Sequence, residues 1–128
     1  MKDFSTFIEE RISAVKNVES NCVATALYLV GERDSYEYLS RGDSRKLLSK
    51  MKKSKEPKLG YLVSWESEGI PFHSGVIFRE EPFHVIHRNN KERLLIDSPL
   101  NEFNEFIFKN LKIEPTYRIP NKFSEEIK

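Results

Sequence analysis

The stretch HSGVIFREEPFHVIH, residues 73–87, decides the fold class of this chain. It holds two runs, 73–78 and 82–87, that are rich in β-branched and aromatic residues. Two such runs separated by a short polar turn predict adjacent antiparallel strands joined as a hairpin. Similar runs at 59–67 and 93–98 predict further strands, so the second half of the chain is expected to form an antiparallel sheet.

The first half of the chain has the spacing of helices. Apolar residues recur three and four positions apart over residues 3–16, which predicts an amphipathic helix. A second helix is predicted over 22–30, where the sequence NCVATALYLVG is apolar on nearly every side, as in a buried helix. Asn21 is expected to be its N-cap, and Gly31 is expected to occupy the C′ position.

The remaining segments complete the predicted architecture. Residues 36–53 are expected to form one broken helix or two short ones, with Asp43 as an N-cap, and the basic run 52–58 a solvated loop. Residues 101–111 fit a helix or a strand equally. Residues 111–120 are expected to add a last edge strand, part of which Pro115 makes less favourable. Helices followed by antiparallel strands predict an α+β fold, with the N-terminal helices packed on one face of the sheet.

The composition is that of a globular domain. The chain has 128 residues, of which 38% are hydrophobic and 32% charged, and its net charge is +1. This length predicts a single domain, residues 1–128, and the small net charge gives no indication of nucleic acid or an anionic membrane as a partner. No apolar run resembles a secretory signal or a transmembrane helix, so we expect a cytoplasmic protein or one exported by a specialised route.

Cys22, the only cysteine, lies at the first turn of the predicted second helix. A lone cysteine in an apolar segment is more often a buried core residue. The start of a helix, however, favours a thiolate, and a neighbouring imidazolium adds to the effect, lowering a thiol pKa from about 8.5 to about 3.5–7.5. The single cysteine also excludes an intramolecular disulfide and a zinc site of several thiolates.

The histidines favour the reactive interpretation of the cysteine. His73 and His87 are 14 positions apart (87 − 73), and in the predicted hairpin His73 faces His87 while Gly75 faces Val85. Directly opposed residues share a face of the sheet, with Cβ atoms about 4.5–5.5 Å apart. His84 has the other parity and is expected to point to the opposite face. Gly75 is expected to leave room for a substrate backbone.

These residue types suit nucleophilic catalysis by a thiol. Cys22 would be the nucleophile, and His73 would accept its proton and return it to the leaving group. His87 would fix the tautomer and angle of His73, although Asn89 or Asp97 could replace it as the orienting residue. The amides at the start of the helix would help to hold an oxyanion.

The same residues resemble those of the NlpC-type cell-wall peptidases, a compact branch of the papain-like cysteine peptidase superfamily. The resemblance rests on NCVATALYLVG, HSGVIF and VIHRN, and it spans about residues 15–120. It matches Cys22 with the family's nucleophile, His73 with its base and His87 with its third residue. It implies a papain-like fold, thiol protease or amidase activity through an acyl-enzyme, and peptidoglycan stem peptide as the substrate.

Two departures from the family's pattern concern the substrate more than the fold. Asn21 precedes the cysteine where the family usually has an acidic residue, and Gly60-Tyr61 stands where it usually has Gly-Asp. Relatives in the wider group are amidases, deamidases and acyltransferases, so a cytosolic or host-directed activity on another amide or thioester is the alternative.

Two other interpretations remain at the level of the sequence. One thiolate and two imidazoles could hold a catalytic zinc ion. Such sites also need a carboxylate base, and the chain has no H-x-E or H-E-x-x-H motif, so neither a metal nor another cofactor is expected. The second is an interaction domain that has lost activity. The expected partner is a peptide or amide substrate, with no nucleic acid and no membrane.

Overall fold

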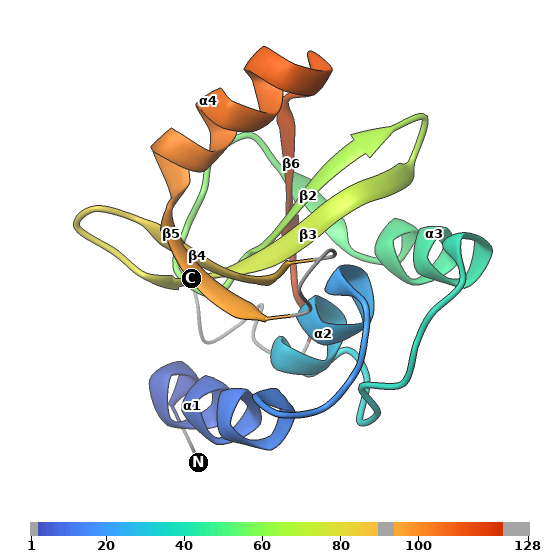
Figure 1. Ribbon diagram of the computed structural model, residues 1–128, viewed down its shortest axis with the longest axis vertical. Helices are drawn as coiled ribbons and strands as arrows, with labels where there is room; N and C mark the ends of the chain where they lie inside the picture. The colour runs from blue at the N-terminus through green and yellow to red at the C-terminus, as the bar shows by residue number, and fades with distance from the viewer. Residues whose placement is uncertain (1–2, 90–93, 122–128) are drawn as a thin grey trace.

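The computed structural model describes residues 3–89 and 94–121, which form an α+β fold (Figure 1). In chain order the elements are α1 (Phe4–Val15), α2 (Cys22–Leu29), α3 (Arg41–Ser49), β1 (Lys52–Ser54), β2 (Leu62–Ser67), β3 (Ile70–Arg79), β4 (His84–Arg88), β5 (Leu95–Pro99), α4 (Leu100–Leu111) and β6 (Pro115–Ile119). The strands of these residues form one antiparallel sheet in the order β1-β6-β2-β3-β4-β5. The α+β prediction is therefore confirmed.

Helices cover both faces of this sheet. In Figure 1, α1 and α2 lie on one side of the strands and α4 lies on the other, while α3 stands beside α2. Val76 and Ile86 pack in the core beneath α1, α2 and α3, whereas Ile77 and Val85 pack beneath α4. The N-terminal helices therefore pack on one face of the sheet, as expected. The segment that fitted a helix or a strand forms α4 and buries its apolar side on the second face.

Helix α2 begins and ends where its capping residues predict. The Oδ1 atom of Asn21 accepts a hydrogen bond from the amide of Ala24 at 3.1 Å, which satisfies one donor of the first turn. At the other end Gly31 has φ 81°, and its amide donates to the carbonyl of Tyr28 at 3.1 Å. The predicted caps are confirmed, and they fix Cys22 at the first position of a buried helix.

Three finer predictions were wrong. The N-cap of α3 is Ser40, whose Oγ accepts from the amide of Asp43 at 3.1 Å, rather than Asp43 itself. The basic run 52–58 contains the short strand β1, because residues 52–54 pair with β6. Strand β6 is consequently not an edge strand: it lies between β1 and β2, and its first residue, Pro115, pairs with Trp65.

The hairpin of β3 and β4 has a register two residues away from the predicted one. Gly75 faces His87, where the sequence pattern placed His73. The ladder is irregular between Ile77 and Arg79, and an extra residue of this kind in one strand is a β-bulge. The shift is an even number of residues, so His73 and His87 keep the same face and lie diagonally across the hairpin.

Two buried arginines tie the helices of the α1–α3 face to the sheet. Arg88 of β4 donates to the carbonyl of Val15 at 2.7 Å, and Val15 is the last residue of α1. Arg118 of β6 donates to the carbonyl of Leu48 at 2.7 Å and pairs with Glu66 at 2.8 Å. Both arginines thus donate to carbonyl groups in the last turn of a helix, where fewer backbone donors are at hand than in the helix interior.

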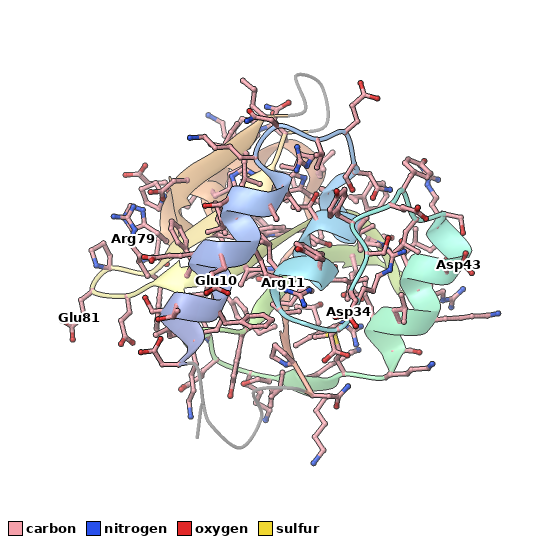
Figure 2. All side chains as sticks on the ribbon, turned by 90° about the horizontal axis from the view of Figure 1, so that it is seen from below. Glu10, Arg11, Asp34, Asp43, Arg79 and Glu81 are labelled. Atoms are coloured by element: carbon pink, nitrogen blue, oxygen red, sulfur yellow. The ribbon has the colours of Figure 1, made fainter. Side chains whose placement is uncertain are left out.

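A third arginine holds α1 against α2 from the outside. Arg11 donates to the carbonyls of Tyr28 at 2.9 Å and Arg33 at 2.8 Å, and it pairs with Asp34 at 3.1 Å. Figure 2 shows Arg11 on α1 turned toward Asp34, which follows α2.

Among the described residues, no helix has both the length and the apolar character needed to cross a membrane.

Candidate active site

Cys22 is a buried residue that nevertheless lines a cavity. Its exposed fraction is 7%, and its helix carries the apolar residues of the α1–α3 core. The cavity has a volume of about 460 Å³, and we call it the Cys22 cavity. Its lining is Glu19, Ser20, Asn21, Cys22, Val23, Tyr38, Leu39, Arg41, Ser44, Pro71 and Phe72.

The two predicted histidines are in direct contact on the other face of the sheet. Nε2 of His73 and Nδ1 of His87 are 2.8 Å apart, and Nε2 of His87 is 3.0 Å from Oγ of Ser98. His87 is 4% exposed, and its partner Ser98 comes from β5. The result is a hydrogen-bonded chain of three side chains that runs across β3, β4 and β5.

The imidazoles face helix α4 and line a second cavity. The ring of Phe103, on α4, lies 4.4 Å from that of His87, 5.4 Å from that of His73 and 5.0 Å from that of Trp65, centroid to centroid. This cavity has a volume of about 290 Å³, and we call it the α4 cavity. Its lining is Trp65, Phe72, His73, His87, Asn89, Phe103, Phe106, Ile107 and Leu111.

Cys22 and the imidazoles therefore belong to different layers of the molecule. Helix α2 and helix α4 cover opposite faces of the sheet (Figure 1). Among the described residues, neither imidazole hydrogen-bonds the thiol of Cys22. The two cavities nevertheless adjoin, because Phe72 lines both of them. The structure thus brings two of the three predicted residues into contact and places the third in the neighbouring cavity.

Burial keeps both imidazoles neutral. Desolvation, together with a smaller effect of the adjacent His87, lowers the pKa of His73 from 6.5 to about 3. Desolvation also lowers the pKa of His87 to about 4, an effect that Asp97 partly opposes. At neutral pH each ring consequently carries one proton and has one nitrogen that can accept a second.

The hydrogen bonds allow one tautomer in which His73 can act as a base. If Nε2 of His73 donates to Nδ1 of His87, then Nε2 of His87 carries a proton and donates to Oγ of Ser98. In this arrangement Nδ1 of His73 holds a lone pair and no proton. It makes no hydrogen bond among the described residues, so it is the nitrogen that can take a proton from another group.

Gly75 has a different role from the one that its sequence position indicated. A Cβ atom at Gly75 would lie 2.6 Å from Cγ2 of Val85, 2.9 Å from Cβ of His87 and 2.9 Å from the carbonyl oxygen of Ile86. The space beside Gly75 is thus filled by β4 and by His87, and it does not leave room for a substrate backbone. The absence of a side chain at Gly75 lets His87 lie close to β3.

His84 lies away from these cavities. Its Nδ1 is 2.7 Å from Oδ1 of Asp97, and Asp97 also pairs with Arg79. His84 thus faces away from the imidazole pair, as its parity predicts. Figure 2 places Arg79 at the opposite end of the molecule from Asp43, which lies on the helix beside the Cys22 cavity. Asp97 is occupied by this group and does not contact His73.

Two residues of the site were missed at the level of the sequence. Ser98 lies in a predicted strand, but only the register of β5 against β4, in which Ser98 faces Val85, brings its hydroxyl to His87. Phe103 lies in the segment that fitted a helix or a strand. The recurrence of Phe103, Phe106 and Ile107 at spacings of three and four residues is the signal that could have identified the apolar side of α4.

The zinc interpretation of the site requires a set of side chains that could hold the ion. Among the described residues, no three His, Cys, Asp or Glu side chains lie together so that they could hold a metal ion. The zinc interpretation therefore has no ligand set in this part of the chain.

No family model, curated protein or solved structure matches the chain. The structure is an α+β domain with a thiol at a helix start on one face of the sheet and a buried imidazole pair on the other.

Proposed function

We propose that this protein is a cysteine hydrolase with a papain-like, NlpC-type fold. In this proposal Cys22 attacks an amide or thioester carbonyl, His73 carries the proton and His87 orients His73. The observation that carries the proposal is the hydrogen bond between Nε2 of His73 and Nδ1 of His87, which are 2.8 Å apart. It occupies the nitrogen of His73 that points to the orienting residue and leaves Nδ1 for the thiol, which is the division of roles that a catalytic base requires.

The position of Cys22 supports its role as the nucleophile. The thiol lies at the first residue of α2 and lines a cavity of about 460 Å³. The partial positive charge at the start of a helix stabilises both a thiolate and the oxyanion that forms when a carbonyl is attacked. A cysteine that served only to fill the core would not need to border a cavity at this end of the helix.

The low imidazole pKa values decide when the proton moves. Because the pKa of His73 is about 3, a stable pair of thiolate and imidazolium is disfavoured at neutral pH. The thiol proton therefore passes to Nδ1 of His73 as the sulfur bonds to the carbonyl carbon. This step requires the thiol and Nδ1 to come into contact beside Phe72, the residue that both cavities share.

The remaining steps release the two products and regenerate the free enzyme. The tetrahedral intermediate collapses, the bond to the leaving group breaks, and the leaving group takes the proton from Nδ1 of His73. A thioester on Cys22 remains. Water then attacks this thioester and gives a proton to Nδ1, and the sulfur leaves and recovers that proton.

Peptidoglycan stem peptide is the favoured substrate, and this choice rests on the resemblance to NlpC-type peptidases alone. A cytosolic or host-directed amidase, deamidase or acyltransferase would use the same steps with a different acceptor or leaving group. The acidic residue that the family usually has near the substrate amine is replaced by Tyr61, which is buried in the core beneath α4. This replacement removes the carboxylate that often helps to recognise the amine, so the resemblance carries over to the fold better than to the substrate.

Acylation of the purified chain by p-nitrophenyl acetate tests the activity without knowledge of the natural substrate. We expect a burst of p-nitrophenolate equal to the enzyme concentration, with the acetyl group on Cys22 by mass spectrometry. Cys22→Ala should abolish the burst with a nearly unchanged thermal midpoint, and His73→Ala should slow it by about 100-fold or more. His84→Ala is the matched control and should acylate at the wild-type rate. A wild-type chain without a burst, or a burst that survives Cys22→Ala, would refute the proposal.

A second candidate function is a binding module of the same fold without catalysis. It is favoured by the placement of Cys22 and the imidazoles in separate cavities. The same assay separates the two functions, because a binding module would show neither the burst nor any dependence of Cys22 acylation on His73.

A further inference from the structure

We infer that the α4 cavity binds an uncharged apolar group, namely an aromatic ring or a short aliphatic chain, in the acyl part of the substrate. This inference rests on the proposed function for the position of that group next to the scissile carbonyl. The preferred substrates would then be amides or thioesters of apolar acyl groups, with the polar part of the molecule on the side of the Cys22 cavity.

The lining of the α4 cavity carries the inference. Phe72, Phe103, Phe106 and Leu111 supply apolar surface, and none of the described residues that line the cavity is Asp, Glu, Lys or Arg. A charged group that entered would lose its hydration without an opposite charge to replace it, which is strongly unfavourable. An uncharged apolar group has no such hydration to lose, and its binding is favoured because apolar surface is removed from water.

The size of the cavity limits the occupant. Its volume of about 290 Å³ is just below the range of about 300–1,000 Å³ for small-molecule sites. A single ring with a short linker fits such a volume better than a long lipid chain. Phe106 and Leu111, with exposed fractions of 60% and 50%, form the outer rim, so a ligand would cover apolar surface that now faces water.

The Cys22 cavity differs in its chemistry. It is lined by Glu19 and Arg41, which are charged, and by Ser20 and Asn21, which are polar. The two cavities meet at Phe72. A substrate that spanned this wall would therefore have an apolar group on the side of the imidazoles and a polar or charged group on the other side.

Binding of small probes to the Cys22→Ala variant tests the inference apart from catalysis. The chain has one tryptophan, and Trp65 lines the α4 cavity, so its fluorescence reports occupancy. We expect 3-phenylpropanamide to bind and to change this fluorescence. Two analogues that carry the charge on the ring itself, 3-(4-carboxylatophenyl)propanamide as the anion and 3-[4-(ammoniomethyl)phenyl]propanamide as the cation, should bind at least about tenfold more weakly, because a charge loses its hydration in this cavity.

Two exposed phenylalanines of α4 provide the matched variants. Phe106 lines the cavity and Phe108 does not, and both are at least 47% exposed, so neither truncation should unfold the protein. Phe106→Ala should weaken binding of 3-phenylpropanamide by about tenfold, since most of one aromatic contact is lost. Phe108→Ala should leave the affinity unchanged.

The outcomes separate this inference from the proposed function. Equal or tighter binding of either charged probe, an equal effect of Phe108→Ala, or an absence of binding would overturn the inference even if Cys22 is acylated by p-nitrophenyl acetate. Selective binding of 3-phenylpropanamide by a chain that gives no acyl-enzyme would instead retain the cavity as an apolar binding site and refute the hydrolase.

Discussion

The two faces of the sheet bury polar groups in different ways. On the α1–α3 face, Arg88 and Arg118 donate to backbone carbonyls, and Arg118 also pairs with a carboxylate. On the α4 face, His73 and His87 bond to each other at the wall of a cavity. Fixed backbone partners are what a structural contact needs, whereas titratable rings that contact each other beside a cavity are available for chemistry.

This difference teaches that burial alone does not identify a functional residue. Arg118 and His87 are equally well buried, with exposed fractions of 4% each. What separates them is the partner: Arg118 is held by Glu66 and the carbonyl of Leu48. His87 instead contacts Nε2 of His73, whose Nδ1 makes no hydrogen bond among the described residues. We therefore expect substitutions of the buried arginines on the α1–α3 face to change mainly stability, and substitutions of the imidazole pair on the α4 face to change mainly activity.

The largest effect on stability is expected at Arg118. The Arg118→Ala variant leaves the carboxylate of Glu66 buried and unpaired, since both side chains are 5% exposed, and should lower the free energy of unfolding by about 3–5 kcal/mol in urea denaturation. The matched control is Arg79→Ala, whose pair with Asp97 is well exposed and should contribute less than about 1 kcal/mol. Similar losses in the two variants would contradict a structural role for Arg118.

A smaller loss is expected at Gly75, together with a loss of activity. The added methyl group of Gly75→Ala would overlap Val85 and displace His87, which should cost about 1–3 kcal/mol and slow acylation of Cys22. Gly42→Ala is the control, because a Cβ atom there meets nothing within 4 Å and α3 should become slightly more stable. If Gly75→Ala retained wild-type stability and acylation, the close approach of His87 to β3 would be unimportant.

The imidazole pair should make stability depend on pH. In the unfolded chain each ring has a pKa near 6.5, and in the folded protein the values are about 3 and about 4. As pH falls below 6.5, the unfolded state therefore takes up protons that the folded state does not. This uptake lowers the free energy of unfolding, by about 1 kcal/mol for each ring between pH 6.5 and 5.5. The contribution is complete above pH 6.5 and is lost on acidification.

Urea denaturation at several pH values checks this effect. His84→Asn should keep the wild-type slope, whereas His73→Asn with His87→Asn should flatten it. The ring protons of His73 and His87 in NMR spectra should show no titration above pH 5. A titration midpoint near 6.5 for either ring would contradict the burial that the structure assigns to the pair.

Much of the fold could be predicted from local signals in the sequence. The caps Asn21 and Gly31 bounded α2, since their capping hydrogen bonds are made with Ala24 and Tyr28 of the same helix. The alternation of apolar residues located four of the strands, and the parity of His73 and His87 placed them on one face. A change of register by an even number of residues leaves both histidines on the same face. Their contact was therefore predicted although the register was not.

The rest depended on contacts between distant segments. The bulge after Ile77 is set by the turn and by packing, and the run 73–87 has no residue that requires it. The short strand β1 exists because β6 returns from the end of the chain to pair with it. The position of Cys22 relative to the two histidines could not be predicted either, because no local pattern indicates which face of the sheet α2 covers.

The central claim is that Nδ1 of His73 takes the proton of Cys22, and the rate of thiol alkylation tests it most directly. Because Cys22 is the only cysteine, modification by iodoacetamide at pH 7 reports on this one thiol. We predict that His73→Ala slows alkylation by about tenfold or more, since it removes the base, while His84→Ala has no effect. Equal rates in the wild type and His73→Ala would contradict the claim and leave the imidazole pair as part of a binding cavity.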